Sequence, residues 1–165
     1  MMTEISLNVL DVSENSTRAG ASLVTILVSA DTSADKLTIV IADNGCGMTP
    51  EQAAHVTDPF FTTRTTRKVG LGIPFFKYAA ESTGGSFHIE SEPGKGTTVT
   101  AVFGLSHIDR MPLGDMNATI HNLIVYHPDT DFLYTYTYND ASFTLDTRQM
   151  GEILGGIPLN TPEVS

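Results

Sequence analysis

Cysteine, basic residues and long apolar runs are scarce in this 165-residue chain. Its single cysteine, Cys46, excludes an internal disulfide and a zinc site built from several thiolates of one chain. Nine Lys and Arg stand against 19 Asp and Glu, and the net charge of −10 argues against binding to nucleic acid or to an anionic membrane. No apolar run is long enough to span a bilayer, and no basic region of a signal peptide is present. We therefore expect a cytoplasmic protein with one domain, or one domain plus an appendage.

The most informative stretch is residues 37–48, LTIVIADNGCGM. Its first five residues are apolar or β-branched, which is typical of a buried strand. Asp43 follows at the expected strand end, where its carboxylate can accept a hydrogen bond from a buried donor. Gly45 and Gly47 allow backbone conformations that other residues disfavour, and allow a ligand to approach closely. Asn-Gly between apolar runs also indicates a hairpin, so this stretch alone fits either a turn or a binding loop.

Residues 4–20 have the periodicity of an amphipathic helix. Three polar residues fall within two turns of it: Asp11, Glu14 and Asn15. Asp11 and Asn15 are four apart and project from the same side. They form either a solvated polar face or the oxygen ligands of a hard ion such as magnesium.

Residues 62–80 contain four basic residues and no acid, including Arg64, Arg67 and Lys68. This segment supplies donors for an anion such as phosphate, or is a mobile surface loop. Gly70-Leu71-Gly72 then precedes a predicted helix over residues 73–81, and a helix N-terminus favours phosphate.

The rest of the chain alternates further strands and helices. Strands are predicted over residues 21–30, 86–91 and 97–103, and a short helix is predicted to start with Thr49 as its cap and Pro50 at its first position, ending near residue 57. Beyond residue 104 we expect a helix over 114–126, a hairpin of 132–138 with 141–146, and a last helix over 148–154. The aromatic hairpin can extend the sheet, cap it, or form a dimer or partner interface.

Five motifs occur in a characteristic order: Asp11…Glu14-Asn15-Ser16, Asp43-Asn44-Gly45-Cys46-Gly47-Met48, Asp58-Pro59-Phe60-Phe61-Thr62-Thr63, Gly70-Leu71-Gly72-Ile73 and Gly94-Lys95-Gly96-Thr97-Thr98. Together they resemble the nucleotide-binding domain of gyrase-type topoisomerases, heat-shock chaperones, sensor histidine kinases and mismatch-repair ATPases, the GHKL superfamily with the Bergerat fold. The Pro-Phe-Phe-Thr-Thr stretch and the Gly-Leu-Gly helix most closely resemble the histidine-kinase branch. The resemblance covers roughly residues 4–103.

The resemblance implies an α/β (α+β) two-layer sandwich: a mixed, mostly antiparallel sheet with helices on one face, and a small C-terminal α+β appendage. We divide the chain into residues 1–104 and 105–165 on this basis.

The resemblance also implies residue roles. Asn15 would coordinate Mg²⁺ bridging the ATP phosphates, and Asp43 would accept the adenine amino group. The other implied nucleotide contacts are the loop residues Gly45, Gly47 and Met48, the lid anchor Phe60, the phosphate-binding Gly70, Leu71 and Gly72, and Thr97 or Thr98 in the pocket wall. From charge alone we add Arg64, Arg67 and Lys68 as phosphate contacts.

The general base of the hydrolysing members falls at Asp11, whose side chain is one methylene shorter than their glutamate. Glu14 is a weaker candidate for the same role. The strands and the dimerising helical hairpin that precede this domain in sensor kinases are missing ahead of residue 4, and no upstream histidine has an acceptor-like setting. We therefore expect a standalone Mg²⁺-dependent ATP-binding domain that phosphorylates a partner protein or hydrolyses ATP to ADP. The alternative is a non-catalytic nucleotide sensor, and a homodimer is possible in both cases.

Overall fold

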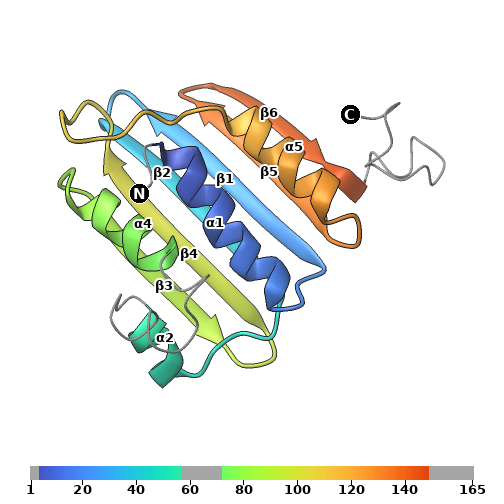
Figure 1. The fold of residues 1–165 in the computed structure, drawn as a ribbon. Coiled ribbons are helices and arrows are strands. Elements are labelled where there is room, and N and C mark those ends of the chain that lie inside the picture. Colours follow the sequence, from blue (N-terminus) through green and yellow to red (C-terminus); the bar gives the residue numbers. More distant parts are fainter. Residues whose placement is uncertain (1–3, 57–71, 149–165) are drawn as a thin grey trace.

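A six-stranded sheet covered on one face by helices makes up the computed structural model, which describes residues 4–56 and 72–148 (Figure 1). The helices are α1 (Ile5–Arg18), α2 (Pro50–Val56), α4 (Gly72–Glu81) and α5 (Met116–Tyr126). The strands are β1 (Leu23–Asp31), β2 (Lys36–Asp43), β3 (Ser86–Glu92), β4 (Gly96–Gly104), β5 (Asp131–Tyr138) and β6 (Ala141–Asp146). These elements confirm those predicted from the sequence, apart from the last predicted helix over 148–154, which lies almost entirely outside the described residues.

The strand order is β3-β4-β2-β1-β5-β6. Only the pairing of β1 with β5 is parallel, and the other four pairings are antiparallel. The predicted mixed, mostly antiparallel sheet is therefore confirmed. Of the three arrangements open for the aromatic hairpin, the structure has the first, because β5 and β6 extend the sheet beyond β1.

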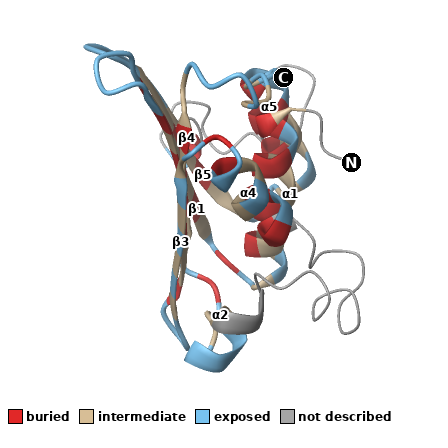
Figure 2. Cartoon of the chain, turned by 90° about the vertical axis from the view of Figure 1, so that its left-hand side faces the viewer, coloured by how far each residue is buried: buried red, intermediate tan, exposed pale blue. Residues whose placement is uncertain are grey.

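One face of the sheet is buried under the helices, and the other is free of them (Figure 2). The period-2 alternation of β1 puts Val24, Ile26 and Val28 on the buried face, each without exposed surface. Their partners on β2 alternate in the same way, so Ile39 and Ile41 are also buried. Burial of apolar surface on this single face is the main force that holds the helices to the sheet.

Helix α1 runs across the middle of the sheet between α4 and α5 (Figure 1). Helix α4 is anchored over β3 and β4 by Phe76, whose ring centroid lies 6.3 Å from that of Phe87 and 5.9 Å from that of Phe103. On the other side, α5 adds Met116, Ile120 and Leu123 to the same hydrophobic core. Residues 105–148 thus share one sheet and one core with the described residues before them.

Candidate functional site

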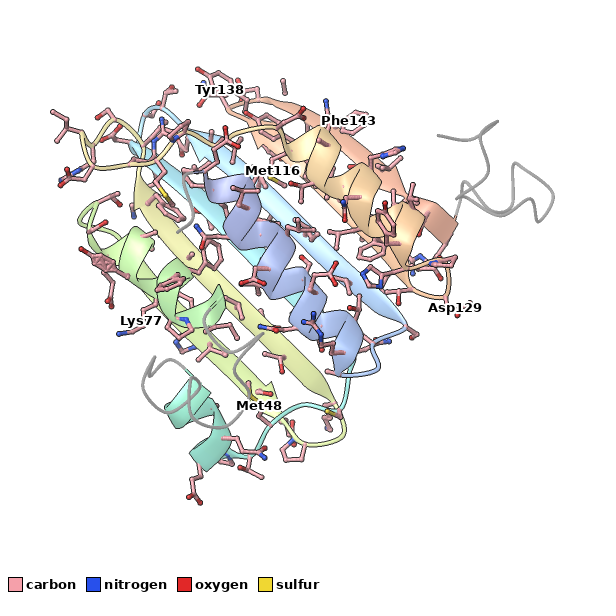
Figure 3. The ribbon with its side chains drawn as sticks, viewed as in Figure 1. Met48, Lys77, Met116, Asp129, Tyr138 and Phe143 are labelled. Atoms are coloured by element: carbon pink, nitrogen blue, oxygen red, sulfur yellow. The ribbon has the colours of Figure 1, made fainter. Side chains whose placement is uncertain are left out.

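The candidate site lies at one end of the sheet, where the C-terminal end of α1, the loop after β2 and the β3–β4 turn come together (Figures 1 and 3). Met48, labelled in Figure 3, marks this end, whereas Met116, Tyr138 and Phe143 mark the opposite end. Backbone hydrogen bonds join the three segments. Cys46 N donates to Ala19 O over 2.9 Å, and Gly94 N donates to Cys46 O over 2.7 Å. The loop is therefore held in place on both sides rather than hanging from the sheet.

The Asp43 carboxylate is fixed at the end of β2 by two donors. Ser16 Oγ on α1 donates to Oδ2 over 2.7 Å, and the Gly45 amide donates to Oδ1 over 2.9 Å. Each carboxylate oxygen has two lone pairs, so both can accept a further hydrogen bond. Because both donors fix the orientation of the carboxylate, the group is prepared as an oriented acceptor for a ligand N–H.

The glycines of this loop are required by protein packing. A Cβ at Gly45 would lie 2.9 Å from Ala19 Cβ, and one at Gly47, where φ is +71°, would lie 2.0 Å from Glu92 O. Similarly, a Cβ at Gly96 would lie 2.0 Å from Asp43 O. These contacts are with neighbouring backbone and side chain. These glycines therefore allow the loop to pack closely against α1 and the β3–β4 turn. This packing role is additional to the role in purine binding that was predicted from the sequence.

Helix α1 presents two different polar flanks. Glu14 faces α5, where its Oε1 lies 2.9 Å from His127 Nε2 and both side chains are about one quarter exposed. By the 100° turn per residue, Asn15 lies about 100° round the helix from Glu14, on the side towards α4, and Asp11 lies between the two, about 60° from Glu14 and about 40° from Asn15. The structure therefore places Asp11 beside Asn15 on the helix, and Glu14, which is also a neighbour of Asp11, pairs with His127.

The surroundings of Asn15 and Asp11 decide what this flank of α1 can bind. Asn15 Oδ1 is buried and has no hydrogen-bond partner within the described part of the chain. Burial raises the pKa of Asp11 above its ordinary value; the nearby charge of Arg18 lowers it and that of Glu14 raises it. A free amide oxygen is a suitable ligand for Mg²⁺, which completes its shell with phosphate oxygens and water. Residues 4–56 and 72–148 contain no group of three or more His, Cys, Asp or Glu that could hold a metal ion.

The β3–β4 edge of the site contains a serine that the sequence did not reveal. Ser91 Oγ accepts from the Met48 amide over 2.8 Å, donates to Gly96 O over 3.0 Å and lies 2.7 Å from Thr97 Oγ1. Ser91 and Thr97 are paired across the strands, on the helix-covered face of the sheet. By strand alternation, Thr98 lies on the opposite face. Of the two predicted threonines, the structure brings Thr97 to the site and not Thr98. Ser91 belongs to none of the motifs found in the sequence. Only the pairing of β3 with β4 shows that it is part of the site.

The structure describes only one of the remaining predicted residues. Gly72 is the first residue of α4, whose start lies beside α1. The others lie outside the described residues and stay predictions: Phe60, Arg64, Arg67, Lys68, Gly70 and Leu71. Lys77, the basic residue of α4, pairs with Glu81 over 3.4 Å.

A separate hollow of about 430 Å³ lies at the opposite end of the molecule. Its lining includes Met116 at the start of α5 and three aromatic residues of the hairpin, Tyr134, Tyr136 and Phe143. Burial raises the pKa of Tyr134 to about 12, with a smaller contribution from Tyr136. None of the residues that line this hollow belongs to the motifs from which the site was predicted.

Comparison with known proteins identifies a family and similar sequences. Residues 1–107 match the model of a family described as histidine kinase-, DNA gyrase B- and HSP90-like ATPase. A probable C4-dicarboxylate sensor kinase of Bacillus subtilis is 33% identical over 76 residues, which are 46% of this chain and 14% of that protein. The sensor protein SrrB of Staphylococcus aureus is 32% identical over 102 residues, 59% of this chain and 17% of SrrB. The chain thus spans less than one fifth of the length of either relative.

The likeness in fold reaches further along the chain than the likeness in sequence. The crystal structure of the N-terminal domain of a DNA repair protein superposes with a TM-score of 0.63, at 13% identity, and covers 88% of this chain and 53% of that one. At this identity the likeness concerns the fold alone. In the described residues, no helix is both long and apolar enough to cross a membrane.

Proposed function

The chain belongs to the family of histidine kinase-, DNA gyrase B- and HSP90-like ATPases, and from this premise we propose that it binds ATP with Mg²⁺ and transfers the γ-phosphate to a separate cytoplasmic protein or to water. The observation that carries the proposal is the relation between two neighbouring residues of α1. Ser16 binds the Asp43 carboxylate, while the buried Oδ1 of Asn15 has no partner among the described residues. One turn of α1 therefore joins an acceptor for adenine to a ligand for a phosphate-bound ion.

The adenine end of the site depends on Asp43. The adenine amino group donates to the carboxylate that Ser16 and the Gly45 amide already orient. A guanine presents a carbonyl oxygen at the same place, which cannot donate, so the carboxylate would select adenine over guanine. Ser91 and Thr97 form the neighbouring wall through their shared hydrogen bond.

The phosphate end depends on α1 and the start of α4. Asn15 would hold the Mg²⁺ ion, which neutralises phosphate charge when bound. The N-terminal end of α4 presents backbone N–H groups and the positive end of its dipole, both of which favour phosphate. Arg64, Arg67 and Lys68 stay proposed contacts of the same phosphates.

Asp11 is the proposed general base. A water molecule or a partner hydroxyl gives its proton to the Asp11 carboxylate as its oxygen forms a bond to the γ-phosphorus. The bond between that phosphorus and the β,γ-bridging oxygen breaks, and ADP leaves with the electron pair. Only an ionised carboxylate can take this proton, and burial of Asp11 opposes ionisation.

That burial favours a second candidate function. If Asp11 is a poor base, the domain would act as a nucleotide sensor whose change of shape on binding ATP controls a partner. The sensor needs Asp43 and Asn15 but not Asp11, which separates the two functions by mutation.

The fate of the γ-phosphate tests the proposal. The protein is incubated with Mg²⁺ and γ-labelled ATP, with and without an extract of the source organism, beside Asn15→Ala and Asp43→Ala variants. Label on a second protein, or released as phosphate, only with the unchanged chain supports the transferase or hydrolase. Label that stays on ATP, with ATP binding measured by calorimetry, supports the sensor. Absence of ATP binding, or binding by Asp43→Ala equal to that of the unchanged chain, would overturn the site.

A further inference from the structure

Asn8 is a polar residue of α1 in the interior of the protein. Its side chain has no exposed surface, and neither Nδ2 nor Oδ1 has a hydrogen-bond partner within residues 4–56 and 72–148. Leaving a buried amide unpaired destabilises a fold, and an apolar side chain would avoid that penalty. A residue that is costly for folding at such a position points to a role in the site.

The position of Asn8 on α1 indicates which role. It lies three residues before Asp11 and seven before Asn15, so the three residues form one row along the flank that faces α4. The helical rise of about 1.5 Å per residue places Asp11 between the two amides, about 4.5 Å along the axis from Asn8 and about 6 Å from Asn15. Side chains three apart on a helix are close enough to form a hydrogen bond.

The chemistry of this row is complementary. An ionised aspartate only accepts hydrogen bonds, and the Asn8 amide offers two N–H donors. The charged groups that act on Asp11 from its own helix are Arg18 and Glu14. On α4, the facing helix, Lys77 and Glu81 pair with each other. Asn8 is thus a neutral donor available to Asp11 beside charges of both signs.

We infer that Asn8 is a positioning residue for the proposed base: with nucleotide in the site, its Nδ2–H group donates to the Asp11 carboxylate and holds it ionised and oriented towards the phosphates. Nucleotide excludes the water that otherwise solvates Asp11, so the carboxylate then needs a protein donor. This inference rests on the proposed function, since it assigns Asn8 a task only if Asp11 acts beside bound ATP.

The matched variants are Asn8→Leu, which keeps the approximate volume but removes the donor, and Ser13→Ala as a control. Ser13 is also buried, its Oγ is also unpartnered among the described residues, and it lies on the α5 flank of the same helix. Asn8→Leu should lower kcat about tenfold or more, leave ATP affinity within about twofold and leave the midpoint of thermal unfolding unchanged or higher. Ser13→Ala should leave kcat and ATP affinity unchanged.

A mutant cycle distinguishes positioning from a general effect on the fold. In an Asp11→Asn background the effect of Asn8→Leu on kcat should vanish, because the residue acts through Asp11. An equal loss of kcat in both backgrounds overturns the inference. If Asn8→Leu does not fold, Asn8→Val tests the same donor.

A crystal structure with Mg²⁺ and a non-hydrolysable ATP analogue gives a readout that does not need turnover. The expected distance from Asn8 Nδ2 to the nearer Asp11 carboxylate oxygen is about 2.7–3.2 Å. An amide bound elsewhere, or still unpaired, overturns the inference while leaving the proposed function intact. Failure of the unchanged chain to bind ATP would overturn both, and calorimetry identifies that outcome separately.

Discussion

Ser16 Oγ donates a 2.7 Å hydrogen bond to Asp43 Oδ2, and this bond ties the middle helix of the fold to the end of β2. Ser16 is itself buried, so the bond forms away from bulk water, where a hydrogen bond to a charged acceptor is strong. The two residues are 27 positions apart in the chain, so the bond depends on how α1 packs on the sheet.

Ser16→Ala should weaken ATP binding about tenfold, equivalent to about 1.4 kcal/mol, because Asp43 keeps its charge but loses one of its two donors. Calorimetric titration with ATP and GTP measures the effect, and discrimination between the two nucleotides should fall. Ser13→Ala, the buried serine on the other flank, serves as the control. Unchanged affinity of the Ser16→Ala protein would mean that the Gly45 amide alone orients the carboxylate.

The pair formed by Glu14 and His127 predicts a structural effect without a catalytic one. Their 2.9 Å contact joins α1 to the C-terminal end of α5. Glu14→Gln and His127→Gln should each reduce the free energy of unfolding by about 0.5–1 kcal/mol, and the double variant should lose less than the sum. Urea unfolding gives these values. ATP affinity and turnover should not change, and a loss of turnover in Glu14→Gln would return Glu14 to the role of base.

Burial of Asp11 predicts a dependence of stability on pH. Its pKa is raised in the folded state, so the folded chain binds a proton more tightly than the unfolded chain. The stability that this residue contributes is complete below the ordinary aspartate pKa and is lost as the pH rises through the raised pKa of the folded state. Asp11→Asn removes that ionisation. The variant should therefore be more stable than the parent at pH 7, with a difference that shrinks as the pH is lowered towards 4.

Urea unfolding at several pH values tests this, with Asp140→Asn in the exposed β5–β6 turn as the control. A destabilised Asp11→Asn protein at pH 7 would show that the ionised carboxylate already makes a favourable bond in the free protein. That result would identify a donor for Asp11 even without nucleotide.

The strands and helices could be predicted from the sequence because burial on one face of the sheet makes apolar residues recur at regular intervals along the chain. The alternation of residues 23–31 and the helical period of residues 5–18 both follow from the same covered face. Asp43 and Asn15 were recognisable because a motif surrounds them. Ser16 belongs to the first motif, but its bond to Asp43 depends on how α1 packs against β2. No local sequence pattern predicts that packing.

Contacts between distant segments explain the rest. Glu14 and Asn15 are adjacent in sequence, yet the helix turns one to α5 and the other to the site flank. Likewise Thr97 and Thr98 fall on opposite faces of β4 once its pairing with β3 is known. Gly47 was expected to admit a purine, and its close neighbour in the structure is Glu92 O at the end of β3, two strands away from β2 in the sheet.

Gly47→Ala should be strongly destabilising because a Cβ would lie 2.0 Å from Glu92 O. Gly94→Ala is a matched control, since φ is +79° there and +71° at Gly47, but nothing lies within 4 Å of a Cβ at Gly94. Both variants carry the cost of a left-handed alanine, about 1 kcal/mol, and only Gly47→Ala adds the clash. Chemical unfolding should show Gly47→Ala less stable by about 2 kcal/mol or more than Gly94→Ala.

The segment beyond residue 104 should be needed for folding even though the family match ends at residue 107. Strand β5 pairs with β1 from Leu23 to Ala30, and Phe132 and Leu123 are buried in the common core. A chain that stops at residue 104 would expose the edge of β1 and part of the apolar surface of α1, so it should aggregate or lack cooperative unfolding. A chain that stops at Arg148 keeps every described strand and helix and should unfold cooperatively. Circular dichroism melting of the two proteins decides the matter, and a cooperative transition in the shorter one would show that residues 1–104 fold on their own.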